Sequence, residues 1–124
     1  MNGLRRLTPA LANNDAEFAL VARMWDGDVL FACGEDAVMM TVREGRVAKV
    51  EQCAQAAAAQ TRVIASADAW EKMLQPLPPP FYQDLFGAAA RHGVLLLGAP
   101  TDVFPYYRAM QRLIELLRTA EGER

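Results

Sequence analysis

Short acidic turns, two of them containing glycine, divide residues 18–52 into four β-prone runs. The runs are FALVARMW, VLFACG, AVMMTVR and RVAKVEQ, and the turns between them are Asp26–Asp28, Glu35–Asp36 and Glu44–Gly45. Glycine supplies the positive φ that a tight hairpin turn needs. The pattern therefore predicts four consecutive strands that form an antiparallel meander.

Alternation within these runs predicts two different sheet faces, because successive side chains of a strand point to opposite sides. One face is expected to be apolar and to carry Phe18, Leu20, Met24, Phe31, Val38, Met40, Val42 and Val50. The other is expected to carry Arg23, Asp28, Arg43 and Lys49, together with Val21, Trp25, Leu30 and Met39. These apolar residues predict a cover for the second face, either Leu4, Leu7 and Leu11 of the N-terminal segment or another chain.

The second half of the chain alternates between strand and helix signals. Cys53–Gln60 (CAQAAAAQ) is either a helical turn or a connector, and Thr61–Ala65 is predicted as a fifth strand. Ser66 is a suitable N-cap for a helix that carries Trp70 on its apolar stripe. The proline-rich stretch QPLPPP should end that helix.

Two further helices and one strand are predicted after the prolines. Pro79 and Pro80 suit the first turn of a helix that ends at Arg91-His92-Gly93. Val94–Leu97 is a short strand, and Thr101 should cap a final helix. The apolar positions of that helix have helical spacing and are Val103, Tyr106, Tyr107, Met110, Leu113, Ile114 and Leu117.

This order of elements predicts a single α+β domain over residues 1–124. It would consist of an N-terminal segment (1–16), a strand-rich half (18–65), a helix-rich half (66–118) and a frayed tail (119–124).

The net charge of −2 gives no electrostatic support for a nucleic-acid partner. We also expect no stable membrane insertion and a cytoplasmic location, because the sequence has neither a signal-peptide pattern nor a run of about 20 apolar residues.

No residue pattern indicates a catalytic centre, a metal site or a cofactor. His92 is the only histidine and should have a capping or surface role at the end of a helix. Cys33 and Cys53 have no metal-ligand spacing and are expected to be inert thiols.

The run from Val63 to Leu117 resembles the sterol carrier protein 2 (SCP-2) domain, in the manner of its short stand-alone bacterial members. The resemblance lies in IASADAWEKML, PPPFYQDLF and VLLLGAPTDVFPYYRAMQRLIELL, together with the meander DVLFACGEDAVMMTVREGRVAKVE. It implies a mostly antiparallel sheet of about five strands with helices packed over one face. It also implies a hydrophobic cavity between sheet and helices that binds fatty acyl chains, sterols or other lipid-like molecules.

The residues expected to line such a cavity are apolar or aromatic. They are Phe18, Met24, Phe31, Met40, Phe81, Tyr82, Leu85, Phe86, Tyr107, Met110 and Ile114. A tyrosine among apolar neighbours can point its hydroxyl at a ligand head group, although ordinary core packing gives the same sequence pattern.

Three functions remain open from the sequence. The first is a carrier of a hydrophobic small molecule. The second is a homodimeric or interaction module with a filled core that assists a partner enzyme, paired through the outer sheet face of Val21, Trp25, Leu30 and Met39. The third is an enzyme that acts on an apolar substrate, which would need an acid or base such as Tyr82, Asp84, Tyr107 or Arg108 inside the cavity.

Overall fold

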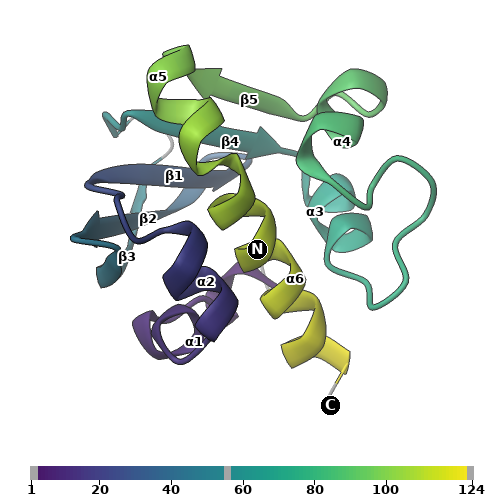
Figure 1. The fold of residues 1–124 in the computed structure, drawn as a ribbon. Helices are drawn as coiled ribbons and strands as arrows, with labels where there is room; N and C mark the ends of the chain where they lie inside the picture. Colours follow the sequence, from purple (N-terminus) through teal and green to yellow (C-terminus); the bar gives the residue numbers. More distant parts are fainter. Residues whose placement is uncertain (1–2, 55–56, 123–124) are drawn as a thin grey trace.

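A five-stranded sheet organises the chain, which a computed structural model describes over residues 3–54 and 57–122 (Figure 1). The strand order is β3-β2-β1-β4-β5. The β1–β2, β2–β3 and β4–β5 pairs are antiparallel, and β1–β4 is parallel. The strands are β1 Gly27–Cys33, β2 Asp36–Arg43, β3 Arg46–Ala54, β4 Thr61–Ala65 and β5 Leu95–Gly98.

The described residues also form eight helical segments. They are η1 Leu4–Arg6, α1 Pro9–Asn13, α2 Ala16–Val21, α3 Ala67–Met73, α4 Leu85–Arg91, α5 Pro100–Val103, η2 Phe104–Tyr106 and α6 Tyr107–Gly122. The helices α1, α2 and α6 lie on one side of the sheet, and α3 and α4 lie at one end of its strands (Figure 1). The predicted α+β class and its mostly antiparallel five-stranded sheet are therefore confirmed.

Residues with positive φ, two of them glycines, form the hairpin turns between β1 and β2 and between β2 and β3. Gly34 has φ 63° between β1 and β2, and Glu44 and Gly45 have φ 51° and 77° between β2 and β3. The Gly45 N–H donates to the Trp25 carbonyl at 3.0 Å. A Cβ at Gly45 would lie 2.7 Å from the Cα of Arg23, so both the turn and this close approach require glycine.

The first predicted strand, FALVARMW, is wrong, because its first half, Phe18–Val21, lies in α2 and its second half contains no strand. Asp15 caps this helix by accepting a hydrogen bond from the Phe18 N–H at 2.8 Å. Phe18 and Ala22 then face the core on helical spacing, whereas Leu20 and Met24 are 61% and 77% exposed. The apolar pattern of this run fits both periodicities, and the aspartate cap decides between them. The inward positions predicted for Leu20 and Met24 are corrected accordingly.

The helix-rich half begins as predicted and then departs from the prediction. Ser66 caps α3 by accepting from the Ala69 N–H at 3.1 Å. The next helix starts at Leu85 with Asp84 as its cap, not at Pro79. Phe81, with φ 67°, cannot belong to a right-handed helix. The prolines therefore lie in a loop over residues 74–84.

The final helix is divided rather than continuous. Pro100 occupies the first position of α5 and Ala99 is its N-cap, so Thr101 does not cap it. Pro105 lacks an N–H and lies in η2, between α5 and α6. The α6 helix then reaches Gly122, so residues 119–122 of the predicted frayed tail are helical.

The chain itself covers part of the outer face of the sheet. Leu30, Ala32 and Ala37 form a small buried cluster there, against which Met39, Cys53, Ala57, Ala59 and Ile64 pack. Leu4 and Leu7 instead join the main core on the helix side, as do Val21 and Trp25. Neither the predicted N-terminal cover nor the predicted outer positions of Val21 and Trp25 are correct.

Candidate functional site

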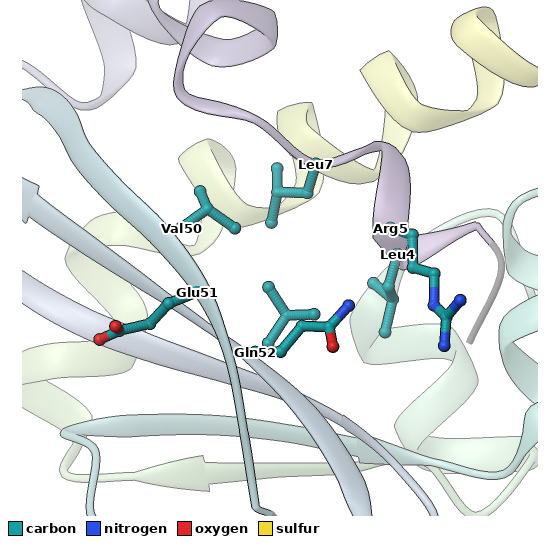
Figure 2. Close-up of a pocket in the computed structure, with 7 residues that line it drawn as sticks. Leu4, Arg5, Leu7, Val50, Glu51 and Gln52 are labelled. Atoms are coloured by element: carbon teal, nitrogen blue, oxygen red, sulfur yellow. The ribbon is translucent and has the colours of Figure 1, made fainter.

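A pocket of about 160 Å³ opens between the N-terminal segment and the sheet edge at β3 (Figure 2). Leu4 and Leu7 form one wall, and Val38 of β2 and Val50 of β3 form the other. Leu4, Leu7 and Val38 are buried, and Val50 packs against the same core. These four apolar side chains connect the pocket with the main core.

Polar side chains surround the opening. Arg5, Glu51 and Gln52 complete the lining, and Arg5 and Glu51 lie on opposite sides of the opening (Figure 2). Glu51 also pairs with Lys49 at 3.4 Å. A pocket lined by both apolar and charged side chains can hold the apolar part of a small molecule and leave its polar part near water.

Local hydrogen bonds place the N-terminal segment over this pocket. Thr8 caps α1 by accepting from the Leu11 N–H at 3.2 Å, with Pro9 at the first helical position. The Asn13 amide then donates to the Val47 carbonyl and accepts from the Val47 N–H, both at 2.9 Å. The Asn13 side chain thus forms the two hydrogen bonds to Val47 that the backbone of a neighbouring strand would form, and it attaches α1 to the edge strand β3.

The N-terminal segment also contacts the proline-rich loop. A Cβ on Gly3 would overlap the Leu74 side chain, so the backbone at Gly3 lies directly against Leu74. Leu74 ends α3 and begins the loop over residues 74–84. Movement of the segment would therefore also uncover the start of this loop.

Most of the predicted cavity residues belong to one buried cluster. Phe18, Phe31, Met40, Tyr82, Leu85, Met110 and Ile114 are buried in the main core, and Tyr107 packs against it. Met24, Phe81 and Phe86 are 77%, 48% and 44% exposed. None of these residues lines the pocket of Figure 2. The structure thus brings eight of the eleven together as packed core.

Sequence reasoning missed the pocket wall formed by Leu4 and Leu7. Leu4 and Leu7 are three residues apart and precede the Thr8-Pro9 helix start. This spacing indicates that both leucines lie on the same side of a short helical segment. The local sequence does not specify which side of the sheet Leu4 and Leu7 cover, because that depends on the hydrogen bonds between Asn13 and Val47.

The tyrosines have structural partners. The Tyr106 hydroxyl donates to the Met24 carbonyl at 3.1 Å, and its ring stacks on Trp25 at 5.0 Å. The Tyr107 hydroxyl accepts from the Phe86 N–H at 3.2 Å, and the two rings stack at 3.9 Å. Burial raises the pKa of Tyr107. These two hydroxyls join helical segments to the rest of the fold.

His92 and Arg118 hold the proline-rich loop. His92 is the C-cap of α4, stacks on Tyr82 at 3.8 Å and lies 3.0 Å from the Pro80 carbonyl through Nε2. The predicted capping role of His92 is confirmed. Arg118 donates to the carbonyls of Met73, Tyr82 and Gln83 at 2.6, 3.0 and 2.7 Å.

Residues 3–54 and 57–122 contain no candidate metal site. No group of three or more His, Cys, Asp or Glu side chains in these ranges could hold a metal ion. The Cys33 thiol is buried, and the Cys53 thiol is half-buried, with its pKa raised mainly by burial. None of the described helices is long and apolar enough to cross a membrane.

Comparison with known proteins identifies the fold. No protein-family model and no curated protein matches the sequence. A crystal structure of sterol carrier protein 2 aligns with a TM-score of 0.73 at 19% identity, over 87% of this chain and 88% of that one. A solution structure from Thermus thermophilus, a conserved hypothetical protein suggested to be a sterol carrier protein, aligns at 0.69 and 20% identity, over 90% and 81%.

A third solved structure extends this comparison. It is named UbiJ-SCP2, a ubiquinone synthesis protein, and aligns with a TM-score of 0.56 at 16% identity, over 95% of this chain and 90% of that one. At these identities the likeness concerns the fold. The chain has the SCP-2-like fold that its sequence pattern predicted.

Proposed function

We propose that this protein binds a lipid-like or other hydrophobic small molecule between its N-terminal segment and the inner face of the sheet. The observation that carries the proposal is the pocket at the edge of the sheet, whose apolar walls are Leu4, Leu7, Val38 and Val50. The fold supports it, since two structural neighbours are named as an actual or suggested sterol carrier protein and a third as a ubiquinone synthesis protein. Sterols and ubiquinone are both largely apolar molecules.

The size of the pocket suggests how such a ligand would enter. Sites for small molecules usually enclose roughly 300–1,000 Å³, whereas this pocket has about 160 Å³. Binding would therefore require the N-terminal segment to move outward. The ligand would then take the places of Leu4 and Leu7 against the core and extend toward Met40 and Phe31.

The energetic balance of this exchange is favourable for a large apolar ligand. Displacing Leu4 and Leu7 costs about 1.5–3 kcal/mol for each buried side chain. A ligand that buries more apolar area than the two leucines offsets this cost at about 25 cal/mol per Å². Small apolar molecules would bind weakly, and long acyl, sterol or isoprenoid groups would bind best. Arg5 at the opening would favour an acidic or strongly polar head group.

The proposal is tested by titration with fluorescent fatty-acid and sterol probes, together with native mass spectrometry of protein purified from cells. Val50→Trp should fill the pocket and weaken probe binding at least about tenfold, a change of about 1.4 kcal/mol. Leu77→Trp is the matched control, because Leu77 is 88% exposed in the proline-rich loop. Absence of any bound or titratable apolar ligand, or binding that Val50→Trp leaves unchanged, would contradict the proposal.

A further inference from the structure

Exposed apolar side chains gather around the edge strand β5. Leu95 and Leu97 are 49% and 41% exposed on the outer face of this strand. On the helix side, Phe86 of α4 and Phe104 of η2 are 44% and 63% exposed, and their ring centroids lie 6.0 Å apart. The helix α4 and the segment α5–η2 flank β5, so apolar groups are present on both faces of the same edge (Figure 1).

The two edges of the sheet differ in how they are protected. The β3 edge carries Arg46, Lys49 and Glu51, and the Asn13 side chain occupies its backbone groups at Val47. No charged residue occurs from Gly93 to Pro100, and β4 is the one strand paired with β5 in the described sheet. Natural sheets protect free edges with short strands, charges, proline or covering segments. β5 is short, at four residues, but contains neither a charge nor a proline.

We propose that β5 pairs antiparallel with β5 of a second copy of this chain and joins the two sheets. A two-fold axis at Leu96 places Leu95 of each copy opposite Leu97 of the other, because residues equally distant from the axis pair. Directly opposite side chains have Cβ atoms about 4.5–5.5 Å apart. The four leucines would then form a common cluster on the outer face, and the Phe86–Phe104 pairs would extend the contact on the helix side.

The apolar composition and self-complementarity of the strand favour a second copy over an unrelated partner. Side chains of these sizes and exposures offer on the order of 400 Å² per copy, about half the area that each partner buries in a standard interface. The dimer should therefore be weak and depend on protein concentration. The proposed dimer contact at β5 and the pocket at β3 lie at opposite edges of the sheet. A failure of the dimer proposal would therefore leave the ligand-binding proposal intact, and a failure of ligand binding would leave the dimer proposal intact.

Sedimentation equilibrium between about 10 μM and about 1 mM covers the range in which a small interface associates. The wild-type chain should approach twice its monomer mass as the concentration rises. Leu95→Lys/Leu97→Lys should remain monomeric, because it places four like charges at the contact. Leu77→Lys, which adds a charge to another exposed leucine, should dimerise normally. Wild-type protein that stays monomeric throughout, or a dimer that survives the double substitution, overturns the proposal.

Amide hydrogen exchange locates the contact independently. The amides of Leu95–Gly98 that point away from β4 should exchange at least about tenfold more slowly at high than at low protein concentration, because pairing occupies them. In the Leu95→Lys/Leu97→Lys variant their exchange should not depend on concentration, and far-ultraviolet circular dichroism should show an intact fold. Concentration-dependent protection confined to β3 or to the helices would overturn the proposal.

Discussion

The carboxylate of Asp15 accepts two hydrogen bonds from the guanidinium of Arg112, at 2.9 Å from Nε and 2.8 Å from Nη2. The same carboxylate caps α2 through the Phe18 N–H. Asp15 therefore caps α2, the helix found where the first strand was predicted. It also links α2 to α6 through Arg112, which lies 97 residues further along the chain. Both charged side chains are largely buried, with 16% and 26% of their surfaces exposed.

Asp15→Ala should destabilise the fold by about 2–3 kcal/mol, since it removes an N-cap and a bidentate charge-assisted pair. Asp15→Asn keeps the capping oxygen and should cost about half as much. Glu17→Ala is the control, because Glu17 is more exposed and lies 3.8 Å from Arg112, and it should change stability by less than about 0.5 kcal/mol. Urea unfolding gives these differences. Equal losses for Asp15→Ala and Glu17→Ala would contradict this role of Asp15.

The same pair should make stability depend on pH in acid. The hydrogen bond from Arg112 holds the pKa of Asp15 below its ordinary value. A carboxyl group whose pKa is lower in the folded than in the unfolded state contributes stability above its unfolded pKa. That contribution falls as the pH drops from about 5 through the folded pKa. Urea unfolding of wild type and Asp15→Asn between about pH 7 and pH 3 should therefore converge at the acid end. A stability difference that stays constant or grows toward pH 3 would exclude Asp15 as the group responsible.

Arg118 should be the main support of the proline-rich loop. Its three bonds to the carbonyls of Met73, Tyr82 and Gln83 tie both ends of the loop to α6. Arg118→Gln should destabilise the fold by about 2 kcal/mol, and Arg118→Lys should recover little, because one ammonium cannot reproduce the planar fork. Amide exchange should speed up over residues 74–84. The exposed Arg108→Gln is the control, and recovery of wild-type stability by Arg118→Lys would show that charge alone suffices.

Several elements could be predicted from the sequence because their determinants are local. The turns at Gly34 and Gly45, the Ser66 cap and the strand Thr61–Ala65 each depend on residues within a few positions. The order of these elements predicted the α+β class, and the resemblance to the SCP-2 domain implied the SCP-2-like fold. The first strand was wrong because the run from Phe18 to Trp25 fits two periodicities, and an adjacent Asp15 cap favours the helix.

The candidate site was less predictable because it depends on contacts between distant segments. The inner-face positions of Val38 and Val50 followed from strand alternation. The opposing wall of Leu4 and Leu7 depends on the bonds between Asn13 and Val47, which are 34 residues apart. Nothing in the local sequence specifies that an asparagine will serve as a partner for an edge strand. Most of the predicted cavity residues lie packed in the main core.

The bonds between Asn13 and Val47 give the sharpest test of how a ligand would reach the pocket. Asn13→Ala leaves the Val47 N–H and carbonyl without their partner at the edge of the sheet. It should reduce stability by about 1–2 kcal/mol and increase amide exchange at Val47. If outward movement of the N-terminal segment limits ligand entry, the same change should increase the association rate of a fluorescent fatty-acid probe, because the open state becomes more populated.

Asn14→Ala is the matched control, since Asn14 is the exposed neighbour at the end of α1. It should alter neither the exchange at Val47 nor the rate of probe association. Stopped-flow mixing at several probe concentrations separates association from dissociation. Faster exchange at Val47 with an unchanged association rate would mean that ligands enter without movement of the N-terminal segment. The pocket would then have to widen from the β3 side, where Val50 forms its wall.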